Sequence, residues 1–235
     1  EVLPGSGLSS SASFEVLIGT IINYLFNDGI VKPDVIAKIG QYAENTYFGK
    51  PCGLMDQIAC ANGGIVMIDF ARPEDPSVEK MRFDLDGYGY ALVIVDTGGN
   101  HANLTEDYAA VRREMGEVAR VLGYECARQI SLDELMANNG RIRNVAGDRA
   151  FLRVLHFIEE NRRVVEQTAA LKREDLGEFL RLVNESGNSS YKYLQNAYTP
   201  QNVSEQGVSL ALALTEKYLR ERDEGACRVH GGGFA

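Results

Sequence analysis

The chain has 235 residues, a formal net charge of −9 and 45% hydrophobic residues, a composition typical of a globular protein with one large domain or two small ones. The acidic balance argues against nucleic acids and anionic membranes as partners, because both are usually bound by a basic face. No run approaches the roughly 18 apolar residues that span a bilayer. We expect no signal peptide, because no basic start with a short apolar core is visible.

The cysteines and histidines of the chain show no pattern of metal binding. Cys52, Cys60, Cys126 and Cys227 form no C-x-x-C pair, and the three histidines have no metal-ligand spacing. Reduced thiols and a cytoplasmic location are the simplest interpretation.

The first predicted element is a segment rich in glycine and serine, Gly5 to Ser13, which leads into a helix over residues 10–27. Glycine lets the backbone approach a ligand closely, and the start of a helix supplies unpaired N–H groups and the positive end of the helix dipole. Together with the serine hydroxyls, these groups predict a site for an anion such as the phosphates of a nucleotide.

Other interpretations of this segment stay open on its residues alone. A Walker loop is absent, because no G-x-x-x-x-G-K-[ST] string occurs. A dinucleotide-binding loop fits in part: Asp28 follows about 20 residues later, but Ser10 stands at the third glycine position and Pro4 interrupts the preceding strand. A flexible turn before an N-capped helix is the third interpretation.

The rest of the chain divides near residue 98 into a mixed half and a helix-rich half. In the first helix, apolar residues recur at helical spacing: Phe14, Leu17, Ile18, Ile21, Ile22 and Leu25. The next expected elements are a helix from Pro33 to about Tyr47, a loop from Gly49 to Gly53, a short helix around Asp56, strands at 65–70, 81–85 and 90–96, and a surface loop at 72–77. Helices are then expected at about 105–122, 148–171, 175–187 and 203–220, with a strand beginning at 227–229.

Asp56 is the strongest candidate for a catalytic residue. It lies in the otherwise apolar stretch from Gly53 to Ala59. A carboxylate in such a place must find a partner or suffer a large desolvation penalty. Burial raises the pKa of a carboxyl group and makes the carboxylate a better base, whereas a nearby cation keeps it ionised. A helix cap or a structural ion pair is the alternative.

Three further residues each have both a functional and a structural interpretation. Glu44, on the second helix, is by itself an ordinary solvated carboxylate, and Tyr108 has the spacing of a core residue within its helix. His230 begins an H-G-G-G string of the kind that forms an esterase oxyanion hole, but no G-x-S-x-G nucleophile motif follows it.

Four ordered motifs resemble those of the GHMP small-molecule kinases, the galactokinase branch in particular. They span nearly the whole chain: Gly7 to Val16 with the phosphate-loop pattern, Ala43-Glu44-Asn45 running to Cys52-Gly53-Leu54-Met55-Asp56-Gln57, Asp107 to Glu114, and Gly231 to Ala235. One departure is that Pro4 directly precedes Gly5, one place later than in many members. The family's sugar-clamp motif is not present to be read, so we expect the parent enzyme to extend beyond both ends of this chain.

The resemblance implies a role for each matching residue. It implies that ATP phosphates are bound by Gly5, Ser6, Gly7, Leu8, Ser9, Ser10 and Ser11. It implies that Ser11 and Glu44 hold Mg²⁺, and that Asp56 accepts the proton of the sugar's anomeric hydroxyl as this hydroxyl attacks the γ-phosphate. Gly53, Asp56 and Tyr108 would meet the sugar.

The resemblance also implies an α+β fold in two parts, both truncated. Residues 1–98 would form a partial ATP-binding domain like domain 2 of ribosomal protein S5, and residues 99–235 a partial helix-rich, ferredoxin-like domain. The implied activity is phosphorylation of galactose at its C1 hydroxyl. Alternatives are a 1-kinase for arabinose, N-acetylgalactosamine or a uronic acid, and a sensor that binds sugar and ATP without turnover. We expect the isolated chain to be a poor catalyst and to self-associate through exposed sheet edges and apolar surface.

Overall fold

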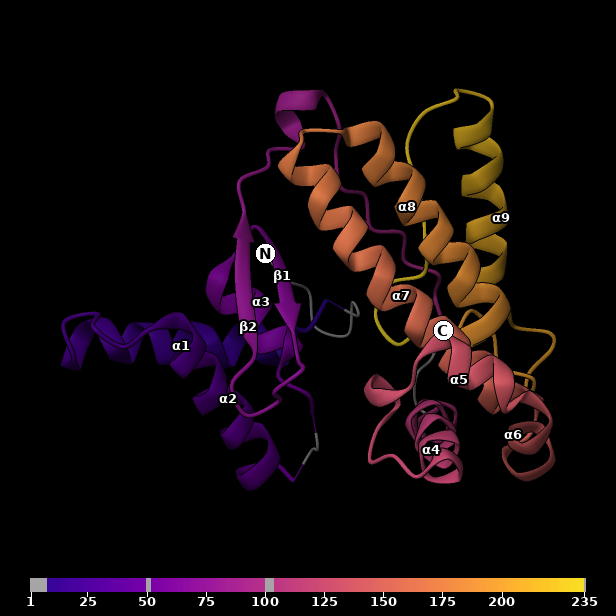
Figure 1. Cartoon of the computed structure of the whole chain (residues 1–235). Helices are drawn as coiled ribbons and strands as arrows, with labels where there is room; N and C mark the ends of the chain where they lie inside the picture. Colours follow the sequence, from indigo (N-terminus) through magenta and orange to yellow (C-terminus); the bar gives the residue numbers. More distant parts are fainter. Residues whose placement is uncertain (1–7, 50–51, 100–103, 235) are drawn as a thin grey trace. The chain divides into compact units, whose positions relative to one another are not determined.

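A computed structural model describes residues 8–49, 52–99 and 104–234 of the chain (Figure 1). The chain divides into two compact units, Glu1–Phe83 and Asp84–Ala235. Among the described residues, no helix combines the length and the apolar character that crossing a membrane requires. The predicted division into two kinase domains at residue 98 stays a prediction.

The first unit consists of three helices and a β-hairpin. Its elements are α1 (Ser10–Phe26), α2 (Pro33–Tyr47), α3 (Met55–Asn62), β1 (Ile65–Asp69) and β2 (Ser77–Met81). The three predicted helices and the first strand are confirmed. The second strand, predicted at 81–85, is wrong, because antiparallel pairing places Met81 opposite Ile65 and leaves no strand residue to pair with residues 82–85.

The three helices of the first unit pack against one another around a small core. Ala37, Leu54 and Ile58 are buried there, and apolar side chains of the hairpin region pack against them. Gly40 brings α2 close to α1, since a Cβ atom at this position would lie 3.3 Å from the Cβ atom of Glu15. This close approach places polar side chains of the three helices in contact, as described below.

The six apolar positions predicted for α1 are all exposed, from 40% at Ile18 to 70% at Leu25. The side chains of α1 that are buried are Ala12, Val16 and Asn23. The helical spacing therefore predicts the helix correctly, while the described residues leave its most apolar face uncovered. Large exposed apolar faces are typical of interaction surfaces.

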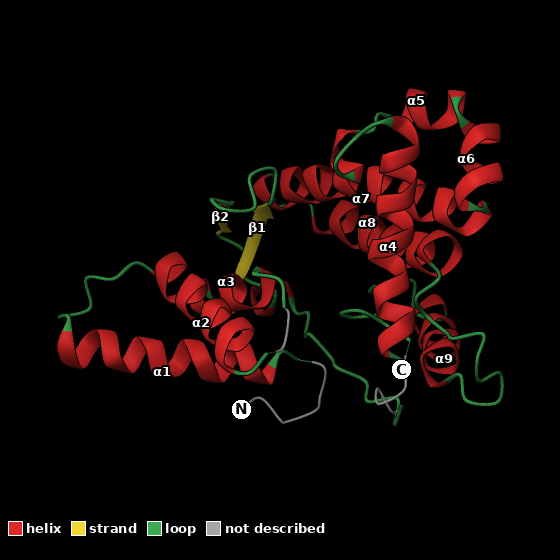
Figure 2. Cartoon of the chain, turned by 90° about the horizontal axis from the view of Figure 1, so that it is seen from below, coloured by secondary structure: helices red, strands yellow, loops and turns green. Residues whose placement is uncertain are grey.

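The second unit is helical (Figure 2). Its α-helices are α4 (Thr105–Leu122), α5 (Leu132–Ala137), α6 (Asn139–Ala146), α7 (Asp148–Lys172), α8 (Leu176–Ser189) and α9 (Gly207–Arg220), with 3-10 turns at Asp86–Tyr88 and Ala127–Gln129 and a π-helical segment at Ser190–Leu194. The four helices predicted in this region are confirmed, although α9 begins four residues later than expected. The short helices α5 and α6 were not predicted.

The strands predicted at 90–96 and 227–229 are wrong for this structure. The described residues contain one sheet, the hairpin of β1 and β2. Leu92 and Val93 are 80% and 74% exposed. A strand needs a neighbour to pair its backbone N–H and C=O groups, and the described part of this unit supplies none for residues 90–96.

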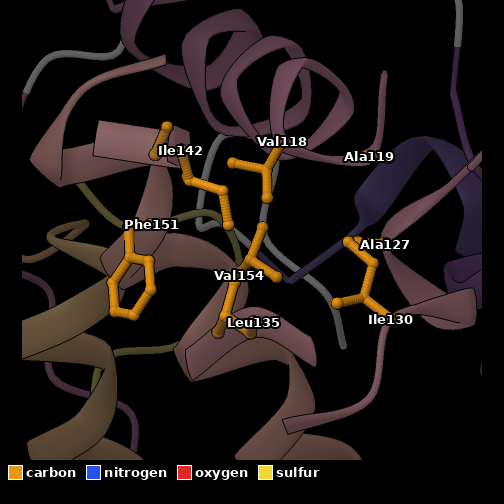
Figure 3. Packing of buried hydrophobic residues seen from close by; sticks show 9 residues of the cluster. Val118, Ala119, Ala127, Ile130, Leu135, Ile142, Phe151 and Val154 are labelled. Atoms are coloured by element: carbon orange, nitrogen blue, oxygen red, sulfur yellow. The ribbon is translucent and has the colours of Figure 1, made fainter. Parts of the chain in front are cut away.

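The core of the second unit forms where α4, α5, α6 and α7 converge (Figure 3). Its buried side chains are those of Val118, Ala119, Ala127, Ile130, Leu135, Ile142, Ala150, Phe151 and Val154. Five of them, Val118, Ala119, Leu135, Ile142 and Val154, are fully shielded from solvent. This cluster orients α4, which carries the predicted sugar-binding residue.

A buried ion-pair network joins α4 to α7. Glu114 on α4 accepts hydrogen bonds from Arg149 and from Arg153, whose Nη1 atom lies 2.9 Å from Glu114 Oε2. Arg153 is only 1% exposed, and its Nε atom donates to the carbonyl oxygen of Leu194 at 3.0 Å. Arg153 therefore links α4, α7 and the π-helical segment.

Replacing Glu114 with alanine should destabilise the protein strongly, by about 3–5 kcal/mol, because the Arg153 charge would stay buried without its partner. The matched control on the same helix is Glu106→Ala, since the Glu106–Arg113 ion pair is exposed and such pairs contribute about 0–1 kcal/mol. Urea unfolding followed by circular dichroism measures both variants. Equal losses would contradict the role of the buried network.

A second buried cluster surrounds His156 on α7. Its Nδ1 atom lies 2.9 Å from Ser189 Oγ, and burial lowers the pKa of His156 to about 4. Glu160, one turn along the helix, accepts a hydrogen bond from Arg163 at 2.8 Å and pairs with Arg228. The neighbouring cations oppose protonation of His156 further, so the folded protein holds this histidine neutral.

Acidification from pH 7 to pH 5 should therefore weaken the fold. Over this range the unfolded state binds a proton at residue 156, with an ordinary pKa of about 6.5, whereas the folded state does not. The loss amounts to at most about 2 kcal/mol at pH 5. His156→Gln should remove this part of the pH dependence in urea unfolding at pH 7 and pH 5. An unchanged pH dependence in the variant would assign the effect to another group.

Candidate active site

The predicted phosphate site begins at the N-terminus of α1. Gly5, Ser6 and Gly7 lie outside the described residues. Ser9 adopts a left-handed backbone conformation with φ 56°, and α1 starts at Ser10 with no acidic side chain in its first turn. The positive end of the α1 dipole is therefore not opposed by a carboxylate of this turn, a condition that favours anion binding.

The two residues predicted to hold a metal ion are in direct contact. Ser11 Oγ donates a hydrogen bond to Glu44 Oε1 at 3.0 Å, and thereby connects the first turn of α1 with α2. Glu44 is 4% exposed, so it is not an ordinary solvated residue on a helix face. Two segments separated by 32 residues of sequence thus place a hydroxyl and a carboxylate side by side.

The donor set fits a hard divalent cation. Within residues 8–49, 52–99 and 104–234, no group of three or more histidine, cysteine, aspartate or glutamate side chains could hold a metal ion. Mg²⁺, however, is usually bound through one or two protein oxygens together with the phosphates of a nucleotide. The oxygens of Ser11 and Glu44 are suitable ligands of this kind, and they lie beside the predicted phosphate site.

Asp56 lies in the first turn of α3 and its side chain is exposed. The sequence context predicts a carboxylate that is desolvated or paired, and this expectation is wrong for the structure: the helix turns Asp56 outward while its neighbours Gln57 and Ile58 are buried. Burial, followed by the charge of Asp56, raises the pKa of Cys60 one turn later. An exposed carboxylate is accessible to a substrate. Gly53, before α3, is also exposed.

Tyr108, in the second unit, is anchored to the C-terminal glycine segment. Its hydroxyl donates to the carbonyl oxygen of Gly233 at 2.7 Å, and its ring packs edge-on against Phe234 with the ring centres 5.3 Å apart. A Cβ atom at Gly232 would lie 2.2 Å from the Tyr108 ring. Burial raises the pKa of Tyr108, so its hydroxyl is neutral and can donate. Tyr108 is half-buried, and its role in sugar binding stays a prediction.

Two further buried residues, one of which contacts the glycine segment, were not predicted from the sequence as site residues. Asn196 is 3% exposed, and its Nδ2 atom donates to the carbonyl oxygen of Gly232 at 3.2 Å. Asp107 accepts a hydrogen bond from Thr199 Oγ1 at 2.9 Å. Both contacts join residues far apart in sequence. Asp107 begins the third motif, but no motif includes Asn196 or Thr199.

A cavity of about 500 Å³ in the second unit lies apart from these residues. It is bounded by α8, α9 and the ends of neighbouring loops, and Tyr90, Asn184 and Glu216 are among its lining residues. None of the predicted site residues lines it. The structure brings Ser11 and Glu44 together in the first unit, which also contains Gly53 and Asp56, and Tyr108 belongs to the second unit.

Comparison with known proteins agrees with these observations. The family profile of the GHMP kinases N terminal domain matches residues 1–64. Galactokinase of Homo sapiens is 34% identical over 235 residues, which cover 98% of this chain and 54% of the relative. Galactokinase of Glaesserella parasuis is 34% identical over 192 residues, which cover 80% of this chain and 48% of the relative. The crystal structure of Lactococcus lactis galactokinase complexed with galactose is 25% identical and has a TM-score of 0.72, with 100% of this chain and 57% of that one covered.

The chain belongs to the GHMP kinase family, and the predicted α+β fold of that family is confirmed. The galactokinases of Homo sapiens and Bos taurus match it along 98% of its length. The chain spans about half the length of the curated relatives it matches.

Alanine at Gly233 should disrupt the anchoring of Tyr108. Gly233 has φ +80°, and a Cβ atom there would lie 1.9 Å from the carbonyl oxygen of Asn196. The matched control is Gly231→Ala, because Gly231 has φ +60° but open space around it. We expect about 1–2 kcal/mol of backbone strain in both variants and about 1–3 kcal/mol of further destabilisation at Gly233 from overpacking. Urea unfolding tests this difference, and equal losses would refute it.

Proposed function

We propose that the protein containing this chain transfers the γ-phosphate of ATP to the C1 hydroxyl of galactose. The observation that carries the proposal is the contact between Ser11 and Glu44, which joins the two predicted metal ligands at the N-terminus of α1. Further support comes from the galactokinase relatives and from a similar structure that contains galactose. We also propose a cytoplasmic location, as the reduced cysteines suggest.

In this proposal the first unit binds the nucleotide. Residues 5–11 and the N-terminus of α1 would bind the ATP phosphates, as helix N-termini commonly do. Ser11 and Glu44 would hold Mg²⁺, which would neutralise charge that develops between the β- and γ-phosphates. The hydrogen bond from Ser11 to Glu44 supports this assignment, because it brings the two side chains into contact.

Asp56 would act on the sugar. Its exposed carboxylate would accept the proton of the C1 hydroxyl as the hydroxyl oxygen attacks the γ-phosphorus atom and ADP leaves. Because the transition states of phosphoryl transfer are loose, positioning of the hydroxyl matters as much as removal of its proton. The backbone at Gly53 and the ring of Tyr108 would contribute to the sugar site.

Asp56→Asn should lower kcat by about 10²–10⁴-fold, the usual contribution of a general base. The measurement is ADP release from Mg·ATP by the full-length protein, against a panel of monosaccharides. The matched control is Asp75→Asn, since Asp75 is 68% exposed and its carboxylate pairs with Lys38 at 3.6 Å and with Arg72 at 3.7 Å. The control should retain full activity.

The outcomes of this assay separate the alternatives. Turnover with galactose that collapses in Asp56→Asn supports the proposal. Turnover with arabinose, N-acetylgalactosamine or a uronic acid instead would keep the mechanism and change the substrate. Binding of ATP and sugar without any ADP release would show a sensor, and the role assigned to Asp56 would be wrong.

A further inference from the structure

Gln57 follows the proposed base Asp56 directly on α3, yet its side chain points into the interior. It is 1% exposed. Its Nε2 atom lies 3.1 Å from Glu44 Oε2 and 3.4 Å from Glu15 Oε2, and these acceptors belong to α2 and α1. One amide group thus connects all three helices of the first unit.

The orientation of this amide follows from its partners. An amide nitrogen carries two hydrogen atoms and can donate to two acceptors. With the amide reversed, Gln57 Oε1 would face two carboxylates and lose both hydrogen bonds. In the observed orientation Oε1 is buried and makes no hydrogen bond to the described residues. An unpaired buried acceptor is costly, so the bonds from Nε2 must outweigh this cost.

The Glu44 carboxylate is consequently held at both of its oxygens. Oε1 accepts from Ser11 Oγ, and Oε2 accepts from Gln57 Nε2. Burial, together with the nearby Glu44 and Glu15 carboxylates, raises the pKa of the adjacent Cys52 thiol. The Glu44 and Glu15 carboxylates therefore both lie close enough to affect Cys52, and the Gln57 amide donates to both of them.

We propose that Gln57 is a positioning residue that orients Glu44 toward Ser11 for binding of the metal–nucleotide complex. This inference rests on the proposed function and assigns Gln57 no contact with the substrate. Groups that orient a metal ligand typically contribute 10–100-fold to metal affinity or activity when they are removed. In this proposal the exposed Asp56 acts on the sugar, and the buried Gln57 acts through Glu44 on the metal–nucleotide complex.

The test measures binding of Mn²⁺, in the presence of ATP, to the full-length protein by electron paramagnetic resonance. Gln57→Met preserves the approximate volume and removes the donor, and Gln57→Asn keeps an amide that is one methylene too short to reach both carboxylates. Both variants should bind Mn²⁺ at least about 10-fold more weakly. The matched control is Gln41→Met, because Gln41 Nε2 donates to the Cys52 carbonyl oxygen and to neither carboxylate in the hydrogen bonds described.

Kinetics and unfolding distinguish positioning from a purely structural role. We expect KM for Mg·ATP to rise with little change in KM for the sugar, while Gln41→Met behaves as the wild type. Unchanged Mn²⁺ affinity in either folded variant at position 57 would overturn the proposal. Loss of the cooperative unfolding transition in both variants would also overturn it, because Gln57 would then act only on the fold.

The proposed function and this inference can fail separately. If the wild type binds Mn²⁺ with ATP in a Gln57-dependent manner but releases no ADP with any sugar, the kinase proposal fails and the positioning role stands. If the wild type phosphorylates a sugar and the Gln57 variants bind Mn²⁺ normally, only the positioning role is refuted.

Discussion

A buried carboxylate must be hydrogen bonded, and each unit of this protein is organised around one. In the second unit Glu114 is held by the guanidinium groups of Arg149 and Arg153. In the first unit Glu44 is held by a serine hydroxyl and a glutamine amide. Guanidinium groups neutralise a carboxylate and complete its hydrogen bonding, whereas hydroxyl and amide donors orient it without cancelling its charge. The first arrangement suits a fixed structural link, and the second fixes the direction of the Glu44 carboxylate.

The helices of this fold could be predicted locally and its sheet could not. The apolar spacing of residues 10–26 and 148–172 specifies helices whether or not a neighbour covers them, so α1 forms even with its apolar face exposed. A strand depends on a partner: residues 90–96 have a strand-like sequence, but the described residues provide no pairing edge. Helix α5 shows a local signal that the prediction missed, since Ser131 and Glu134 form a capping box.

The candidate site shows the same division between local and long-range information. Motifs singled out Ser11, Glu44 and Asp56, and the contact between the first two agrees with their predicted roles. The exposure of Asp56 could not be read from its apolar neighbours, because consecutive residues on a helix point in different directions. Gln57 ends the second motif, which assigned it no role, and Asn196 lies in no motif; the partners of both on other elements are brought near by packing alone.

The anchoring of Tyr108 is compatible with its proposed role in sugar recognition. Its hydroxyl binds the Gly233 carbonyl, its ring contacts Phe234, and the lack of a side chain at Gly232 leaves room for that ring. A ring fixed in this way loses little further conformational entropy when a ligand packs against it. Recognition of a small polar molecule gains from such rigidity, because a displacement of one ångström in a positioning group is costly for catalysis. Gly232 therefore leaves the space that the Tyr108 ring occupies, and Gly233 provides the carbonyl oxygen that orients its hydroxyl.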